Sequence, residues 1–357
     1  MSNPIHLAIL GAGRWGTHLV RNFLSHPQAK VVAVVDPNLD CLARLAERLD
    51  LTGITTATDW TIIHQLPQVD AVAIVTPAST HYGLIRAALE QGYHVLAEKP
   101  LTLTVQESLE LCHLAQKQQR QLVIDHTYLF HPAVRQGQST VASGVLGDLR
   151  YGYAARTHLG PVRQDVDALW DLAIHDIAIF NHWLGEFPCS AEARGMIWLQ
   201  PQLKVVEIFP EGLSDLVWAK LTYPSGFQVL IHLCWSNPDK QRRLTVVGSQ
   251  AALIFDELAE TPLVLQRGAF ECLVRKPNTP PTYSPIHQNR EVIELQPAEP
   301  LREVCTHFLN CVATNQPSQI SSGWLGTRLV KILTALTTSL NQGGLPIALT
   351  YDEVTSA

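Results

Sequence analysis

The chain has 357 residues, of which 46% are hydrophobic and 16% charged, and its net charge is −6. This length and apolar content predict a globular protein with room for two domains and a cleft for a cofactor. The charges are scattered along the sequence, which argues against nucleic acid or a membrane surface as a partner, since both need clustered Lys and Arg.

Seven cysteines lie at irregular spacing without a CxxC motif, a pattern typical of reduced thiols. The first residues lack the pattern of a signal peptide, and no apolar segment is long enough to span a bilayer. We therefore expect a cytoplasmic protein with no membrane segment.

Strands and helices alternate over the first 127 residues. The near-continuous apolar runs predict strands over 5–13, 30–36, 69–77, 93–100 and 121–127. Amphipathic periodicity predicts helices between them, over 14–24, 39–50, 79–92 and 105–120. This alternation is typical of a parallel, doubly wound sheet in an α/β protein.

After about residue 146 the strands follow one another through turns such as "YPSG" (223–226), which indicates an antiparallel sheet. The predicted strands are "GDLRYGYAART", "LVWAKLTY", "FQVLIHLCW" and "RRLTVVG". Two helices are expected here, over 167–184 and about 323–342, and the Pro-rich segment 276–285 is expected to be an exposed loop.

The segment "GAGRWG" (11–16) follows a strand and opens a helix, as a dinucleotide-binding fingerprint does. Gly11 permits the tight turn, Gly13 lets the backbone approach a pyrophosphate, and Gly16 allows close helix–strand packing. Asp36 ends the next strand, where a carboxylate would hold a ribose 2′-OH and repel a 2′-phosphate, so NAD is favoured over NADP. The alternative is a glycine turn with a capping aspartate. The other fingerprint residues, also expected at the cofactor, are Ala12, Arg14 and Trp15.

Two further motifs follow strands, on the ligand side of such a sheet. In "VTPASTHYG" (75–83), Thr76 and Pro77 are expected to line the cofactor, together with His81, whose alternative is a capping or surface histidine. In "AEKP" (97–100), Glu98 and Lys99 are expected beside the nicotinamide, where the lysine could stabilise an alkoxide. The alternative there is a surface turn with an ordinary Glu–Lys pair.

The segment "DLAIHDIAIFNHWLG" (171–185) is apolar around most of its helical circumference, yet it contains Asp171 and His175 four residues apart. An imidazole oriented by a carboxylate suits general base chemistry near neutral pH. A metal site is the rival use, but no third ligand lies at a persuasive spacing, so no metal is expected. A buried pair that only fixes the helix register is the remaining alternative.

These motifs, in this order, resemble the Gfo/Idh/MocA oxidoreductase family, and the resemblance extends to "LTVVGSQAALIFDE" (244–257) and "SLNQGG" (339–344). The resemblance implies an NAD-binding Rossmann domain over 1–126. It also implies a C-terminal α/β domain over 127–357, with a large, mostly antiparallel sheet that binds substrate and builds a homodimer or homotetramer. Lys99 matches the family's active-site lysine, and Asp171 and His175 match its acid and histidine.

The segment "HLGPVRQDVDALWDLAIHD" (158–176) resembles the branch of the family that acts on nucleotide sugars more than the inositol branch, which usually has glycine at the position of Ala173. Ile174 departs from the proline or valine frequent in the nucleotide-sugar branch, so the substrate stays open. Arg163 is a candidate substrate contact or a surface salt bridge, and His126 is a candidate contact or a structural residue.

The expected activity is NAD(H)-dependent interconversion of a secondary alcohol and a ketone on a sugar, a nucleotide sugar or a cyclic polyol. His175 would remove the hydroxyl proton, Lys99 would hold the oxygen, and Asp171 would orient His175. A nucleotide- or sugar-binding sensor without turnover, and a reductase of C=C or C=N bonds, are the alternatives within the same fold.

Overall fold

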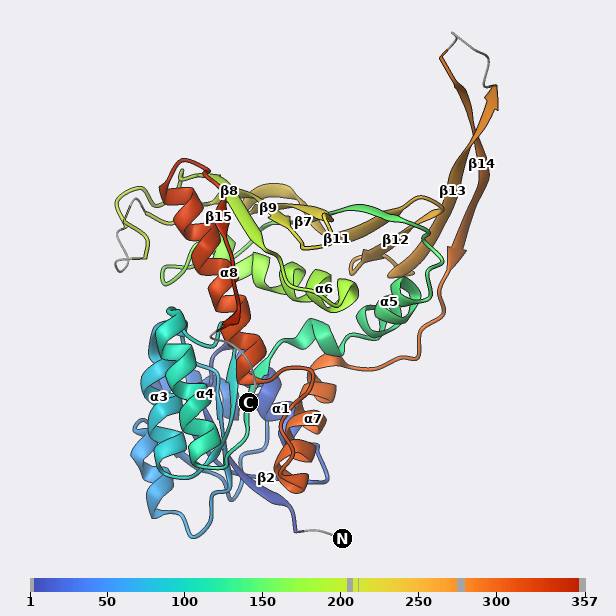
Figure 1. The fold of residues 1–357 in the computed structure, drawn as a ribbon. Helices are drawn as coiled ribbons and strands as arrows, with labels where there is room; N and C mark the ends of the chain where they lie inside the picture. The colour runs from blue at the N-terminus through green and yellow to red at the C-terminus, as the bar shows by residue number, and fades with distance from the viewer. Residues whose placement is uncertain (1–2, 204–207, 211, 275–279, 353–357) are drawn as a thin grey trace. The chain divides into compact units, whose positions relative to one another are not determined.

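A computed structural model describes residues 3–203, 208–210, 212–274 and 280–352 (Figure 1). The chain forms two compact units. The first contains the residues up to 130 together with 298–331 and 351–352, and the second contains 131–297 and 332–350. The predicted division into domains 1–126 and 127–357 stays a prediction.

The first unit is built on a six-stranded parallel sheet in the order β3-β2-β1-β4-β5-β6. This strand order confirms the predicted doubly wound parallel sheet. The central strands are apolar and buried on both faces, as in other sheets of this kind. The three-residue strand β3 is too short to give a sequence signal. The strands are β1 (Ile5–Leu10), β2 (Ala29–Val35), β3 (Thr55–Ala57), β4 (Ala71–Ile74), β5 (His94–Glu98) and β6 (Leu122–Asp125).

Helices cover both faces of this sheet, with α1 against α7 and α3 against α4 (Figure 1). The apolar face of α1 buries Leu19, Val20 and Phe23, and α4 begins after Thr104, whose side chain accepts the Glu107 N–H. The helices are α1 (Arg14–Leu24), α2 (Leu39–Ala46), α3 (Ala78–Glu90), α4 (Val105–Lys117) and α7 (Pro300–Thr314), with 3₁₀ turns η1 (Trp60–Gln65) and η2 (Thr127–Phe130).

The second unit contains a nine-stranded sheet in the order β14-β13-β12-β11-β7-β10-β9-β8-β15. Strands β7 and β10 pair in parallel and all the other neighbours are antiparallel, so the prediction of a mostly antiparallel sheet is confirmed. The strands are β7 (Leu149–Leu159), β8 (Ser190–Met196), β9 (Leu216–Thr222), β10 (Gln228–Cys234), β11 (Ser236–Gly248), β12 (Ala251–Asp256), β13 (Leu263–Val274), β14 (Thr282–Val292) and β15 (Ile347–Ala348).

The prediction of an exposed loop over 276–285 is wrong for residues 282–285, which belong to β14. Pro285 lies opposite Phe270 on β13. Strand β14 is the outermost strand of the sheet, and an edge strand tolerates a proline because one of its sides needs no N–H donor. Residues 276–279 lie outside the described residues.

Helices α5 (Pro132–Ala142) and α6 (Ile174–Leu184) pack together on one face of the sheet (Figure 1). A Cβ at Gly137 of α5 would collide with the indole of Trp183, and that indole donates to the Val134 carbonyl at 2.8 Å. A π-helical turn, η3 (Leu169–Ala173), leads directly into α6. The long helix α8 (Gly323–Asn341) occupies the predicted place.

Within the described ranges, no helix has both the length and the apolarity that a membrane crossing requires. Over the same residues, no group of three His, Cys, Asp or Glu side chains is arranged to hold a metal ion. The thiols of Cys41, Cys112, Cys189, Cys234, Cys305 and Cys311 are free.

Candidate active site

The glycine-rich turn after β1 has the geometry of a dinucleotide fingerprint. Gly11 has φ +106°, and a Cβ there would collide with the Val75 carbonyl. A Cβ at Gly16 would collide with the Gly11 carbonyl, whereas a Cβ at Gly13, the N-cap of α1, would meet no atom within 4 Å. The turn therefore brings α1 close to the strand and leaves its first amides open to a phosphate group.

Asp36 lies beside this turn, directly after β2, and is 9% exposed. Its Oδ2 accepts the Ala12 N–H at 2.7 Å and its Oδ1 accepts the Asn38 N–H at 2.8 Å. The carboxylate thus stands next to the fingerprint, as a ribose-binding acid would, and also holds two backbone amides, as a capping aspartate would. Arg14 and Trp15 are exposed at the start of α1.

The loop after β4 contains half-buried Thr76 and exposed Pro77, which precedes α3. His81 is 1% exposed, so the alternative of a surface histidine is wrong. Its Nε2 lies 2.9 Å from the Thr76 carbonyl and its Nδ1 lies 2.8 Å from the Pro100 carbonyl. His81 therefore ties this loop to the turn that contains Lys99.

The turn after β5 contains half-buried Lys99, joined to Pro100 by a cis peptide bond. Glu98 is 6% exposed, and its Oε2 accepts the Lys99 N–H at 3.2 Å. Burial, and then the neighbouring charge of Asp125, raise the pKa of Glu98 well above its ordinary value. Lys99 thus lies at the carboxyl end of a strand in the unit that contains the fingerprint.

Asp125 is a part of this cluster that the sequence motifs did not single out. It ends β6, is 1% exposed, and is the register partner of Glu98 on the adjacent strand. Its Oδ1 accepts the Thr127 hydroxyl at 2.6 Å, and burial raises its pKa. The sequence feature that could have identified Asp125 is its position at the end of a predicted strand, since the strand before it in the sequence leads to Lys99.

His126 follows Asp125 and is 1% exposed. Neither ring nitrogen has a hydrogen-bond partner among the residues that the structure describes. Burial, and then the positive charge of Lys99, lower the pKa of His126 to about 3. The imidazole is therefore neutral, and both of its nitrogens are left unused in the first unit.

In the second unit, Asp171 lies in the π-helical turn η3 rather than in the regular α-helix that its sequence spacing predicts. Its Oδ1 accepts from Arg163 Nη1 at 3.2 Å, and its Oδ2 accepts from Trp235 Nε1 at 3.3 Å. His175 is half-buried in the first turn of α6. Single π turns in helices occur frequently at functional sites. Trp235 was missed because it lies far away in sequence, between β10 and β11.

Arg163 forms a salt bridge with Asp165 at 2.5 Å, which agrees with one of the two alternatives for this residue. It also contacts Asp171. Its side chain is 28% exposed. The backbone carbonyl of Arg163 accepts from the Gln200 side chain at 2.8 Å, which joins its loop to the segment after β8. Arg163 is therefore part of the immediate surroundings of the candidate acid.

Two more buried acids support the helix that contains His175. Asp176 forms a bidentate ion pair with Arg156 of β7, at 3.1 and 2.8 Å, and both side chains are at most 4% exposed. Asp167 accepts the Trp170 N–H at 3.0 Å; burial, with a smaller contribution from the negative charge of Asp171, raises its pKa to about 7. These contacts fix η3 and α6 on the sheet.

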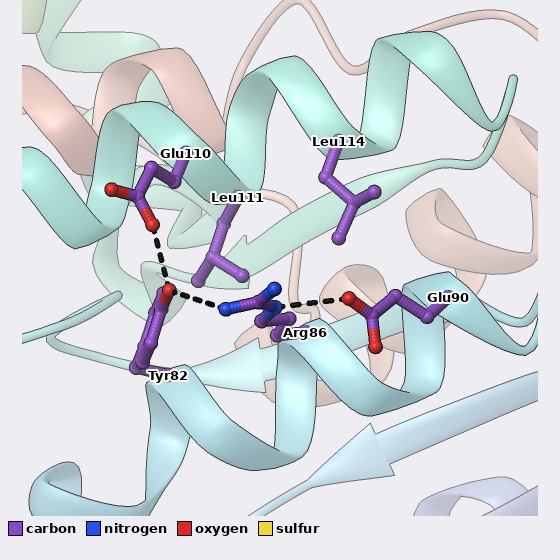
Figure 2. A pocket seen from close by; sticks show the side chains of 6 residues that line it. All are labelled: Tyr82, Arg86, Glu90, Glu110, Leu111 and Leu114. Carbon is purple, nitrogen blue, oxygen red and sulfur yellow. Dashed lines mark hydrogen bonds and ion pairs between the residues drawn. The ribbon is translucent and has the colours of Figure 1, made fainter.

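A surface pocket lies elsewhere in the first unit, between α3 and α4 (Figure 2). Tyr82 donates to Glu110 at 2.6 Å, while Arg86 donates to Tyr82 at 3.2 Å and to Glu90 at 2.9 Å. The polar groups of this pocket thus satisfy one another. The pocket is lined by helix residues and contains none of the candidate site residues.

The chain belongs to the Gfo/Idh/MocA oxidoreductase family. Residues 5–126 match the family's NAD-binding Rossmann fold, and residues 134–254 match a C-terminal domain of the same family. The first of these matches and the fingerprint geometry together identify the first unit as the NAD-binding part of an oxidoreductase.

Among its relatives, inositol 2-dehydrogenase 4 of Saccharopolyspora erythraea is 31% identical over 65% of this chain and 68% of that protein. The NAD⁺-dependent scyllo-inositol 2-dehydrogenase of Bacillus subtilis is 26% identical over 98% of this chain and 97% of its own. UDP-N-acetylglucosamine 3-dehydrogenase of Acidithiobacillus ferrooxidans is 26% identical over 88% of this chain and 91% of its own. A solved structure of that enzyme has a TM-score of 0.76 at 23% identity over 96% of this chain and 99% of that one, and so shares the fold.

Proposed function

We propose that this protein interconverts a secondary alcohol and a ketone on a sugar, a nucleotide sugar or a cyclic polyol, with NAD as the hydride carrier. The single observation that carries the proposal is Lys99, held in a turn at the carboxyl end of β5 in an NAD-binding unit. Ligands of open α/β sheets bind at that end of the strands. The names of the relatives, which act on inositols and on a nucleotide sugar, support the substrate class.

The proposed chemistry assigns one role to each of three residues. In the oxidation, His175 removes the hydroxyl proton while the carbon-bound hydride leaves for NAD. Lys99 donates a hydrogen bond to the substrate oxygen and stabilises the negative charge that develops there. Asp171 orients His175, and in the ketone reduction His175 returns the proton.

The contacts of Asp171 support its role as a carboxylate of fixed orientation. Arg163 donates a hydrogen bond to one of its oxygens and Trp235 donates to the other. We also propose Arg163 and His126 as substrate contacts. The pattern of 158–176 favours a nucleotide sugar over an inositol as substrate, and the relatives include enzymes named for each of these classes.

We further propose a homodimer or homotetramer that forms through the open face of the nine-stranded sheet. Four large side chains on neighbouring strands there are between 38% and 56% exposed: Tyr151, Tyr153, Trp218 and Leu230. Leu230 lies opposite Tyr153, and the Trp218 ring stacks on His232 at 5.8 Å, so the side chains form one surface. Free thiols such as exposed Cys189 fit a cytoplasmic location.

The decisive experiment is NADH absorbance after mixing the purified protein and NAD with nucleotide sugars, free sugars and inositols. We expect a rise with wild type and a loss of kcat of about a thousandfold in Lys99→Ala, because the developing charge loses its donor. Exposed Lys117 on α4 provides the matched control, Lys117→Ala.

Unchanged turnover in Lys99→Ala would remove the lysine from the mechanism. If the wild type binds NADH but forms none with any compound of the panel, the result would contradict the proposed activity and favour the sensor without turnover.

A further inference from the structure

The residues around Lys99 contain an unusual concentration of unused polar atoms. Glu98 Oε1, Asp125 Oδ2 and both ring nitrogens of His126 are buried without a hydrogen-bond partner in the described part of the chain. Native proteins leave few such atoms unsatisfied, and each one calls for an explanation. A proton between the two carboxyl groups would give each of these two carboxyl oxygens a partner.

The strand geometry brings the two carboxyl groups together. Glu98 and Asp125 are register partners on the adjacent parallel strands β5 and β6, so their side chains leave the same face of the sheet from backbones about 4.8 Å apart. One oxygen of each group is already held, Glu98 Oε2 by the Lys99 N–H and Asp125 Oδ1 by the Thr127 hydroxyl. The remaining oxygens are the two without a partner.

Two ionised carboxylates this close in a buried site repel each other strongly, and such a pair retains one proton. We propose that Glu98 and Asp125 share a single proton between Glu98 Oε1 and Asp125 Oδ2, so that the pair presents one negative charge to Lys99. Asp125 is then a positioning residue for the reacting lysine. The importance of that lysine rests on the proposed function, whereas the shared proton does not.

Two other titratable groups near the pair carry no charge. His126 is neutral, as its lowered pKa requires. Cys305 of α7 stays a thiol, because burial and then the charge of Asp125 raise its pKa well above the ordinary value. Lys99 interacts electrostatically with both carboxyl groups, so one shared negative charge would balance its positive charge.

A shared proton has a consequence that a pair of independent acids does not have. An amide at either position reproduces the protonated partner, since its N–H₂ donates to the remaining carboxylate and the pair keeps a charge of −1. Asp125→Asn and Glu98→Gln should therefore each lower kcat by less than about tenfold. The double variant loses the charge altogether and should lower kcat by about a hundredfold or more, a strongly non-additive result.

The direct test is the infrared band of a protonated carboxylic acid, recorded on the unliganded protein at neutral pH. Wild-type-minus-variant spectra should contain this band for Asp125→Asn and for Glu98→Gln, because the surviving carboxyl ionises in each variant. Asp167, whose pKa is also raised, contributes to the same region but cancels in these differences. Exposed Glu110→Gln is the matched control and should leave the band unchanged.

The absence of the band from both difference spectra would overturn the proposal. It would also be overturned if either single variant lowered kcat as much as the double variant does. If Asp125→Asn does not fold, Glu98→Gln reports on the same proton. Because the spectra need neither substrate nor turnover, an intact band in an inactive protein would contradict the proposed function and leave the shared proton standing.

Discussion

Asp36 and Asp171 are both acids of the candidate site, yet the chain holds them by different means. Asp36 is held by backbone amides of Ala12 and Asn38, which belong to turns at the ends of neighbouring strands. Asp171 is held by the side chains of Arg163 and Trp235, the second of them 64 residues away in sequence. A carboxylate bound to backbone depends on the local path of the chain, whereas one bound to side chains depends on distant residue identities.

The largest effect expected in the second unit is on stability. Arg156→Ala leaves the Asp176 carboxylate buried without its partner, which should lower the free energy of unfolding by about 3 kcal/mol or more. Urea unfolding measures this. The double variant Arg156→Met with Asp176→Leu should lose much less, since no charge is stranded; equal losses would mean that packing, not charge, explains the effect.

A smaller stability effect depends on pH. The pKa of Asp167 is about 7 in the folded protein and near its ordinary value of 3.8 when unfolded, so its contribution to stability is greatest below pH 4 and is lost as the pH rises towards 7. Asp167→Asn, which still accepts the Trp170 N–H, should therefore raise the unfolding free energy at pH 8 by roughly 2 kcal/mol, about half of what the full pKa difference would give. A gain of the same size at pH 4 would contradict this cause.

The distant support of Asp171 is tested by Trp235→Phe, which removes the donor to Asp171 Oδ2 and puts a smaller apolar ring in its place. We expect kcat to fall about tenfold with little change in KM, because the acid loses part of its orientation and substrate binding does not. Exposed Trp198→Phe is the control for the catalytic rate. If kcat were unaltered, Asp171 would not need its distant donor.

The smallest effect expected is on cofactor preference. Asp36→Ala removes the carboxylate beside the fingerprint, so the preference for NAD over NADP should narrow about fivefold, as measured by the ratio of kcat/KM values. Because two backbone amides lose their acceptor, stability needs to be checked on the same samples. An unaltered ratio in a folded variant would leave Asp36 with the capping role alone.

Local sequence patterns were sufficient to predict the parallel sheet, the glycine fingerprint and the mostly antiparallel second sheet. These depend on patterns that are local in the chain, such as the apolar run of β1 and the glycines at 11, 13 and 16, whose conformational needs do not vary with distant neighbours. Lys99 was found by the same means, from a motif at a strand end.

The partners of the functional side chains could not be predicted in this way, because they come from segments that are distant in the sequence. The Glu98–Asp125 pair needs two strands in register, Trp235 reaches Asp171 across 64 residues, and Arg156 meets Asp176 only when α6 lies on β7. The π turn at Leu169–Ala173 and the strand that contains Pro285 also departed from the local pattern. Hydrogen bonds and ion pairs between side chains act over a few ångströms in space, and separation in sequence does not encode that distance.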